Sequence, residues 1–217
     1  MAPPHFRATP NHRTTSLLRA VLPLTSPPLH SIPPQPLSGF HQLTQNPTHS
    51  PIPMALSTGS PAPDFKLTTL GANGPEYVTL SENAGKSNVV LLFVPMAFTG
   101  VCTKELCEIS GGLNEFTALN ARVLAISGDN PFAQKAWADK ENITLTLLSD
   151  YDHATTSAYG IAYDSFLPDK NLGQAGVPKR SAFVVDKSGV LQYAEVLENP
   201  GDLPDFAAIK AVLASLS

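Results

Sequence analysis

The two cysteines of this 217-residue chain, Cys102 and Cys107, are the side chains best suited to covalent chemistry. A cysteine attacks as its thiolate, and a helix N-terminus or a nearby Arg or Lys favours that form. Cys102 follows a buried apolar segment and a short loop, so we expect it in the first turn of a helix. Unpaired backbone N–H groups and the helix macrodipole favour an anion there. The alternative is that Cys102 is a small, unreactive core residue.

The spacing of the cysteines limits what else they can do. They lie five positions apart, and the chain has no second pair. A four-ligand zinc site or the disulfide framework of a small secreted domain would need more such residues. We therefore expect no metal site, and no organic cofactor is implied.

The residues around Cys102 form a motif. The segment that ends at Cys107 reads Val-Pro-Met-Ala-Phe-Thr-Gly-Val-Cys-Thr-Lys-Glu-Leu-Cys. It resembles the peroxiredoxin signature Pro-x-x-x-Thr-x-x-Cys, with Pro95, Thr99 and Cys102 in the fixed places. Ala-Phe-Thr-Gly-Val-Cys is similar to the alkyl hydroperoxide reductase E branch, and the second cysteine to the bacterioferritin comigratory protein (peroxiredoxin Q) branch. The resemblance runs from about Ser60 to the C-terminus and includes Lys-Arg-Ser-Ala-Phe-Val-Val-Asp, which resembles the family's arginine-bearing strand.

The resemblance implies a role for each motif residue. Cys102 would be the peroxidatic cysteine, and Thr99 would hold the thiolate and the incoming peroxide through its hydroxyl. Pro95 would shield the sulfur from water, and Arg180 would supply positive charge. Glu105, one helical turn beyond Cys102, either orients Arg180 or is an ordinary first-turn acid. Each residue also has a simpler alternative. Pro95 could only end a strand, Thr99 could be an ordinary helix cap, and Arg180 could be a solvated surface charge.

The implied activity is that of a thiol peroxidase in cell redox homeostasis, an antioxidant enzyme. It would reduce hydrogen peroxide and organic hydroperoxides through a sulfenic acid on Cys102. Thioredoxin, glutaredoxin or a similar dithiol would recycle it, and the family likeness implies a monomer or a homodimer. A thioredoxin-like disulfide oxidoreductase is an alternative, although its Cys-x-x-Cys spacing is absent. A non-catalytic redox sensor using the same thiolate is another.

Cys107 is expected either to resolve the sulfenic acid or to be a buried cysteine of a one-cysteine enzyme. Five residues along an ideal helix leave Cα atoms roughly 8–9 Å apart and side chains about 140° apart. A disulfide needs Cα atoms within about 7 Å. Resolution by Cys107 would therefore require the first turns of the helix to unwind in each cycle, as peroxiredoxin Q proteins are understood to do.

Strands and helices alternate after Met54. The apolar run at residues 88–94 is typical of a strand buried on both faces, and Lys187-Ser188-Gly189 predicts a hairpin turn. The expected strands are residues 64–69, 77–80, 88–94, 122–127, 145–148, 182–186 and 190–197. The expected helices are residues 101–120, with a bend at Gly111-Gly112, and residues 131–141, 152–159 and 203–216. This order predicts an α/β fold with a mixed central sheet and helices on both faces, and the resemblance implies that it is thioredoxin-like.

The N-terminal segment has a different composition from the rest. The first acidic residue is Asp64, and 14 of the 21 prolines lie at or before Pro63. We expect residues 1–58 to be a disordered, proline-rich leader and residues 59–217 to form the thioredoxin-like domain. Residues 1–53 fit a transit peptide for a plastid or mitochondrion. Alternatively, Met54 is the true start and the protein is cytoplasmic.

Charge and hydropathy limit the classes of binding partner that we expect. All 18 acidic residues but only 11 of the 14 basic residues lie after residue 53, so the folded part is acidic. Nucleic acid is not an expected partner because backbone binding needs clustered Lys and Arg. No apolar run approaches the roughly 20 residues that span a bilayer, so no membrane association is expected.

Overall fold

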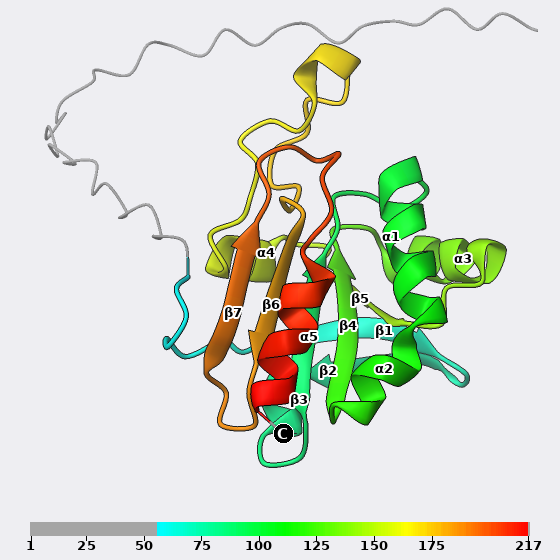
Figure 1. Ribbon diagram of the computed structural model, residues 1–217. Helices are drawn as coiled ribbons and strands as arrows, with labels where there is room; N and C mark the ends of the chain where they lie inside the picture. Colours follow the sequence, from blue (N-terminus) through cyan, green and yellow to red (C-terminus); the bar gives the residue numbers. More distant parts are fainter. Residues whose placement is uncertain (1–55, 217) are drawn as a thin grey trace, which may run out of the picture. The chain divides into compact units, whose positions relative to one another are not determined.

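A computed structural model describes residues 56–216 (Figure 1). The expected leader at residues 1–58, including the transit peptide or alternative start, lies almost wholly outside the described residues. The described chain forms a seven-stranded sheet in the order β2-β1-β5-β4-β3-β6-β7. Its strands are β1 (Lys66–Gly71), β2 (Gly74–Thr79), β3 (Asn88–Phe93), β4 (Ala121–Ser127), β5 (Thr146–Ser149), β6 (Ser181–Val185) and β7 (Leu191–Val196).

The sheet is mixed. The central strands β3, β4 and β5 are parallel, and β1 and β6 pair with them in the antiparallel sense. The outer strands β2 and β7 close the two edges through antiparallel pairing. The carboxyl ends of the three parallel strands therefore meet at one edge of the sheet.

Helices cover both faces of this sheet, as Figure 1 shows for α5, α1 and α2 in front and α4 behind. The α-helices are α1 (Gly100–Gly111), α2 (Leu113–Ala118), α3 (Pro131–Glu141), α4 (Ala154–Ala158) and α5 (Phe206–Ser215), and two 3-10 turns are η1 (Leu80–Asn83) and η2 (Pro168–Lys170). None of the described helices is long and apolar enough to cross a membrane.

Strand β3 separates two hydrophobic cores. Successive side chains of a strand point to opposite faces, and β3 is apolar on both. Val90 and Leu92 pack beneath α1, α2 and α5, whereas Leu91 and Phe93 pack on the other face with Tyr159. A strand buried on both sides is rigid, which suits it to hold the loop that follows.

The expected α/β architecture and each expected strand and helix are present, and the ends are shifted for all of these elements except α3. The helix expected over residues 101–120 is interrupted at Gly112, whose backbone (φ −100°, ψ 10°) leaves the helical region. Helix α4 begins after His153 rather than at residue 152 because His153 adopts a left-handed conformation (φ 59°). Helix α5 begins after Asp205, whose carboxylate accepts the backbone N–H of Ala208.

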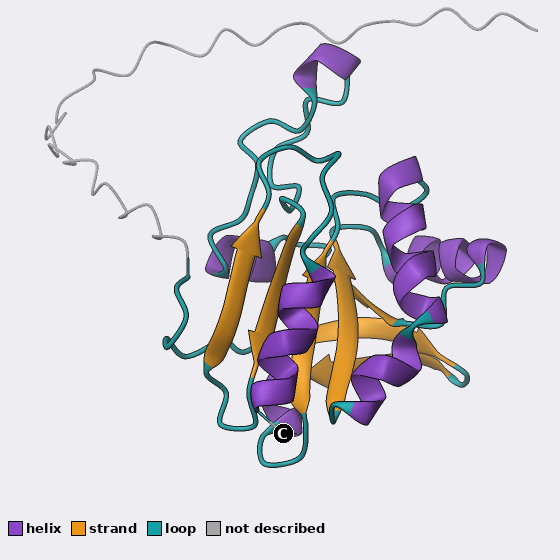
Figure 2. Ribbon diagram, viewed as in Figure 1, coloured by secondary structure: helices purple, strands orange, loops and turns teal. Residues whose placement is uncertain are grey.

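Loops gather at the edge where the parallel strands end (Figure 2). They include the β3–α1 loop, the β4–α3 turn and a long connection between α4 and β6 that carries η2. Functional residues commonly lie on such loops, held by a rigid scaffold. Pro95, Thr99, Cys102 and Arg180 lie at this edge, where the end of β3 pairs with the start of β6.

Candidate active site

Cys102 is the third residue of α1 and is 1 % exposed. The N–H of Thr103 donates to the Thr99 carbonyl at 2.9 Å, which begins the helical ladder. The N–H groups of the residues before Thr103 have no carbonyl of their own helix to bind. Cys102 thus lies where the backbone presents partial positive charge.

Arg180 is brought to Cys102 from the residue that precedes β6. Its Nη2 lies 3.2 Å from the Cys102 Sγ, within hydrogen-bonding reach. The same side chain donates from Nε and Nη2 to the Pro200 carbonyl, at 3.3 and 3.1 Å. Because Arg180 is 1 % exposed, its charge acts on the sulfur with little screening by water.

Glu105 completes the fixation of this guanidinium. It lies one turn after Cys102 on α1 and accepts a hydrogen bond from Arg180 Nη1 in a buried ion pair. Burial raises the pKa of Glu105 to about 7, although the attraction and hydrogen bond of Arg180 act in the opposite direction. Its Oε1 has no hydrogen-bond partner among the described residues. Glu105 therefore orients Arg180 at a cost in desolvation.

Thr99 and Pro95 flank the sulfur on the β3–α1 loop. Thr99 is the N-cap residue of α1, and its hydroxyl donates to the Met96 carbonyl at 2.8 Å rather than to Cys102. Its proton is thus engaged, and the hydroxyl oxygen is left to accept a hydrogen bond from a protonated ligand. Pro95 is buried beside the strand end.

A cavity of about 230 Å³ opens onto Cys102. Pro95, Thr99 and Arg180 lie in its wall, together with Gly100, Val101, Phe166, Leu167, Leu172, Pro200 and Gly201. Arg180 and Cys102 are the buried members of this lining, whereas Leu167 and Leu172 are exposed apolar side chains. A small polar ligand with an apolar substituent fits this distribution of groups.

Cys107 points away from Cys102. Its thiol donates to the Glu141 carbonyl at 3.5 Å, at the end of α3. Burial, and secondarily the Glu141 carboxylate, raises the pKa of Cys107. Both cysteines are free thiols within the continuous helix α1. The structure therefore brings Pro95, Thr99, Glu105 and Arg180 to Cys102 but leaves Cys107 apart.

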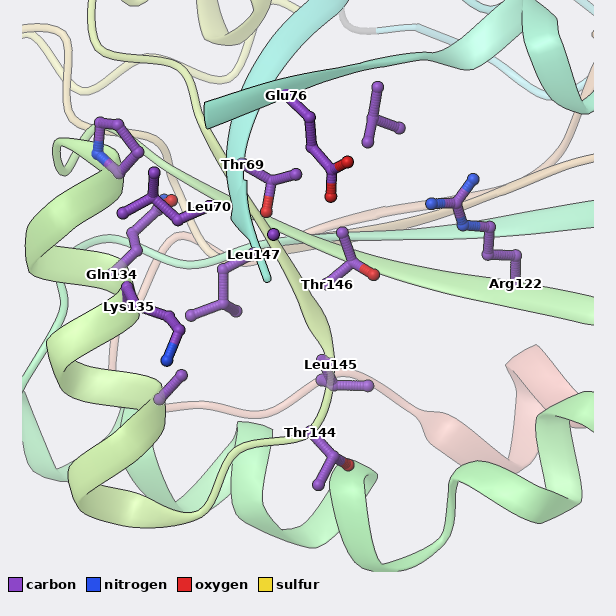
Figure 3. Close-up of a pocket in the computed structure, with 14 residues that line it drawn as sticks. Thr69, Leu70, Glu76, Arg122, Gln134, Lys135, Thr144, Leu145, Thr146 and Leu147 are labelled. Carbon is purple, nitrogen blue, oxygen red and sulfur yellow. The ribbon is translucent and has the colours of Figure 1, made fainter. Parts of the chain in front are cut away.

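A second pocket of about 260 Å³ lies against α3, β1, β2 and β5 (Figure 3). Glu76, Arg122 and Lys135 are the charged side chains that line it, and its described lining contains neither cysteine nor histidine. No cluster of three or more potential metal ligands occurs among residues 56–216. The reactive thiol therefore marks the smaller cavity at Cys102 as the candidate active site.

Comparison with known proteins agrees with this geometry. Residues 58–194 match the AhpC/TSA family. Alkyl hydroperoxide reductase E of Mycobacterium tuberculosis (strain ATCC 25618 / H37Rv) is 38 % identical over 164 residues, which cover 75 % of this chain and 99 % of that protein. This chain is a peroxiredoxin of the AhpC/TSA family. It is accordingly a thiol peroxidase, as the motif around Cys102 predicts.

Further proteins similar to this chain are also peroxiredoxins. A chloroplastic peroxiredoxin Q of Gentiana triflora is 33 % identical, covering 83 % of this chain and 85 % of that one. The solved structure of peroxidoxin BcpB from Mycobacterium tuberculosis matches with a TM-score of 0.59 at 28 % identity, over 73 % of this chain and 95 % of the other. Reduced 2-Cys peroxiredoxin of Plasmodium vivax matches with a TM-score of 0.63 at 27 % identity, over 72 % and 79 %. These matches confirm the expected thioredoxin-like fold.

Several residues of the site carry no local signal in the sequence. The carbonyl of Pro200 holds Arg180, and Phe166, Leu167 and Leu172 form the cavity wall. They come from two loops far from the motif. The exposed Leu-Pro around residue 167, in a segment without periodicity, is the one feature that could have drawn attention to this wall.

Proposed function

We propose that this peroxiredoxin reduces hydrogen peroxide and organic hydroperoxides at Cys102, with Thr99, Pro95, Arg180 and Glu105 as its supporting groups. The observation that carries the proposal is the 3.2 Å contact between Arg180 Nη2 and Cys102 Sγ at the start of α1. The guanidinium and the unpaired helix N–H groups place hydrogen-bond donors and positive charge at the sulfur.

The chemistry follows from the same groups. The Cys102 thiolate attacks the terminal peroxide oxygen, a new S–O bond forms and the O–O bond breaks. The sulfur is oxidised by two electrons to sulfenic acid, and the alkoxide or hydroxide takes a proton to leave as alcohol or water. Negative charge moves onto the leaving oxygen during this step. Donors from Arg180 and the helix backbone that face its path therefore stabilise the transition state more than the ground state.

Each neighbouring residue has a distinct part in this proposal. Thr99 accepts a hydrogen bond from the peroxide O–H through its free lone pairs, because its own hydroxyl donates to the Met96 carbonyl. Pro95 excludes water from the sulfur. Glu105 fixes the plane of Arg180 so that Nη2 faces Cys102.

Cys107 resolves the sulfenic acid in this proposal. Its thiol displaces water from Cys102 to give a disulfide, and an external dithiol then reduces that bond by exchange. The helical geometry of α1 keeps the two sulfurs apart, so resolution proceeds through a locally unwound α1. Gly100 before the cysteines and Gly111-Gly112 after them weaken the helix at both ends.

The experiment is stopped-flow reduction of hydrogen peroxide and of an alkyl hydroperoxide by wild type, Cys102→Ser and Cys107→Ser, with and without thioredoxin. We expect Cys102→Ser to lose turnover. Cys107→Ser should retain one oxidation event and lose efficient recycling by thioredoxin. Undiminished turnover of Cys102→Ser would overturn the proposal, and non-reducing peptide maps without a Cys102–Cys107 disulfide would overturn the resolving role.

The proposal extends to the reductant, the oligomeric state and the cellular location of the enzyme. Thioredoxin or glutaredoxin is the dithiol donor, and the enzyme acts as a monomer or homodimer without nucleic acid or membrane partners. Residues 1–53 decide the location: the protein is cytoplasmic if synthesis starts at Met54, and plastid or mitochondrial if these residues act as a transit peptide. Mass spectrometry of the mature N-terminus, and light scattering of the purified protein, test these points.

A further inference from the structure

Asp129 lies just after β4 and connects the carboxyl ends of the three parallel strands. Its Oδ2 accepts the backbone N–H of Ala97 at 2.8 Å, from the β3–α1 loop. The same oxygen accepts the Ser127 hydroxyl at 2.8 Å, and the Asp129 carbonyl accepts the Ser149 hydroxyl at 2.7 Å, at the end of β5. None of these contacts touches Cys102 or the cavity beside it.

The loop that Asp129 holds has an unusual backbone. Phe98, next to Ala97, has φ 61°, a left-handed conformation that is uncommon for a bulky residue. Such a conformation persists only when the surroundings fix it on both sides. Thr99 is fixed on one side by its hydrogen bond to Met96, and Ala97 is fixed on the other by Asp129.

The Phe98 side chain alone gives weak support to this turn. Its ring is 50 % exposed, and it contacts the Trp137 ring at a centroid distance of 6.3 Å and the Lys140 ammonium at 5.6 Å. The stronger restraint is the charge-assisted hydrogen bond from the nearly buried Ala97 N–H to the Asp129 carboxylate. Removing that acceptor would leave a donor at a 7 % exposed residue without a partner.

We propose that Asp129 is a positioning residue for peroxide reduction, holding Ala97 so that the β3–α1 loop places Thr99 beside Cys102. This inference rests on the proposed reaction at Cys102. A displacement of about 1 Å in a reacting geometry can cost about 100-fold in rate. Asp129 therefore affects the step that needs Thr99, whereas the approach of Arg180 to the sulfur does not depend on it.

The test separates peroxide chemistry from thiolate reactivity. We would measure the second-order rate constants for oxidation of Cys102 by peroxide and for its alkylation by iodoacetamide, which has no O–O bond to break. Asp129→Ala should slow the peroxide reaction at least tenfold while the alkylation rate stays within about twofold of wild type. The side chain of Asp129→Ser does not extend to the Oδ2 position, so this variant should show the same two rates as Asp129→Ala. It replaces Asp129→Ala in the test if that variant does not fold.

Two matched variants complete the test. Asp129→Asn keeps an oxygen acceptor for Ala97 and should restore most of the peroxide rate. Ser149→Ala removes only the hydrogen bond to the Asp129 carbonyl and should leave both rates near wild type. Circular dichroism and thermal melting would establish that each variant is folded at the assay temperature.

The outcomes are distinguishable. An unchanged peroxide rate in folded Asp129→Ala or Asp129→Ser would overturn the positioning role. Parallel loss of the peroxide and alkylation rates would overturn it as well, because that pattern indicates general damage around Cys102. Peroxide reduction by Cys102→Ser would instead overturn the reaction proposed for the site, independently of any Asp129 variant.

Discussion

The carboxylate of Glu105 pairs with the guanidinium of Arg180 where neither side chain reaches solvent, at 0 % and 1 % exposure. The pair connects α1 to the start of β6 and holds Arg180 so that its Nη2 faces Cys102. Buried ion pairs are poor sources of stability because each charge loses its hydration. This one is therefore best understood as a device for orientation.

The first prediction concerns pH and Glu105. Burial raises the pKa of Glu105 from 4.5 to about 7, so the folded protein binds this proton more tightly than the unfolded chain does. The contribution of Glu105 to stability is therefore fully present below pH 4.5 and is lost as pH rises through about 7. We expect the free energy of unfolding to fall by roughly 1–3 kcal/mol more between pH 5 and pH 8 in wild type than in Glu105→Gln.

Urea unfolding at several pH values, followed by circular dichroism, measures this difference. Glu115→Gln is a suitable control because Glu115 is an exposed acid paired with Lys210. Identical pH slopes for wild type and Glu105→Gln would refute the prediction.

A second prediction separates the orienting role of the ion pair from its effect on stability. Arg180→Met should leave the buried Glu105 carboxyl without a partner and raise its pKa further, and the unsatisfied group should cost about 1–3 kcal/mol. The double variant Arg180→Met/Glu105→Leu removes both charges and should recover most of that stability. Peroxide reduction should remain at least about 100-fold slower in both variants, because the donor beside the sulfur is missing.

Thermal melts and single-turnover peroxide assays on the same samples check this prediction. Recovery of the peroxide rate together with stability in the double variant would show that Arg180 acts through the fold alone. Failure of the double variant to regain stability would show that Arg180 has a further structural role through Pro200.

The sequence predicts this site in part, for physical reasons. The placement of Cys102 at a helix start can be predicted from neighbouring residues, because an apolar strand and a proline precede it. The proximity of Arg180 came from the family resemblance, since no local rule joins residues this far apart in the chain. The roles of Pro200 and Asp129 could not be predicted, because a carbonyl or a turn carboxylate becomes a partner only through the paths of distant loops.

The helix ends, too, were predictable only where the local sequence decides them. The helix α3 was predicted with its observed ends, because Pro131 suits a first turn and Asn142 adopts the left-handed conformation that ends it. The break at Gly112 was expected only as a bend. Periodicity continues across that glycine, and the packing of Leu113 and Phe116 against the core decides that a new helix starts there.

A third prediction uses the chain's single tryptophan as a reporter of α1. Trp137 is fully buried, and its indole N–H donates to the Thr103 hydroxyl at 3.0 Å, next to Cys102. Unwinding of α1 to form a Cys102–Cys107 disulfide would break this contact. We expect peroxide to change Trp137 fluorescence in two phases in wild type, and the second phase to be missing in Cys107→Ser.

Thr103→Val is the matched control, because it removes the hydrogen bond and keeps the shape of the side chain. Its second phase should differ in amplitude while its rate stays close to that of wild type. Indistinguishable traces from wild type and Cys107→Ser would argue against unwinding of α1 for resolution.

The last prediction concerns the ionisation of Cys107. Burial and the Glu141 carboxylate raise the pKa of this thiol above its usual value of 9.0, so at neutral pH it is largely protonated. Because the thiolate is the attacking form, the rate of disulfide formation should rise about tenfold per pH unit between pH 6 and pH 8.5. Glu141→Gln removes the negative charge but keeps the carbonyl that accepts the thiol, so it should resolve faster than wild type at any pH in this range.

Quenched-flow trapping of the sulfenic acid, followed by mass spectrometry, measures the resolution rate directly. The exposed Glu115→Gln, which changes net charge equally but lies away from Cys107, should match wild type. Equal rates in wild type and Glu141→Gln would mean that Cys107 ionises only after it has left the contact with α3. In that case unwinding of α1, rather than the environment seen in the intact helix, would set the pH dependence of resolution.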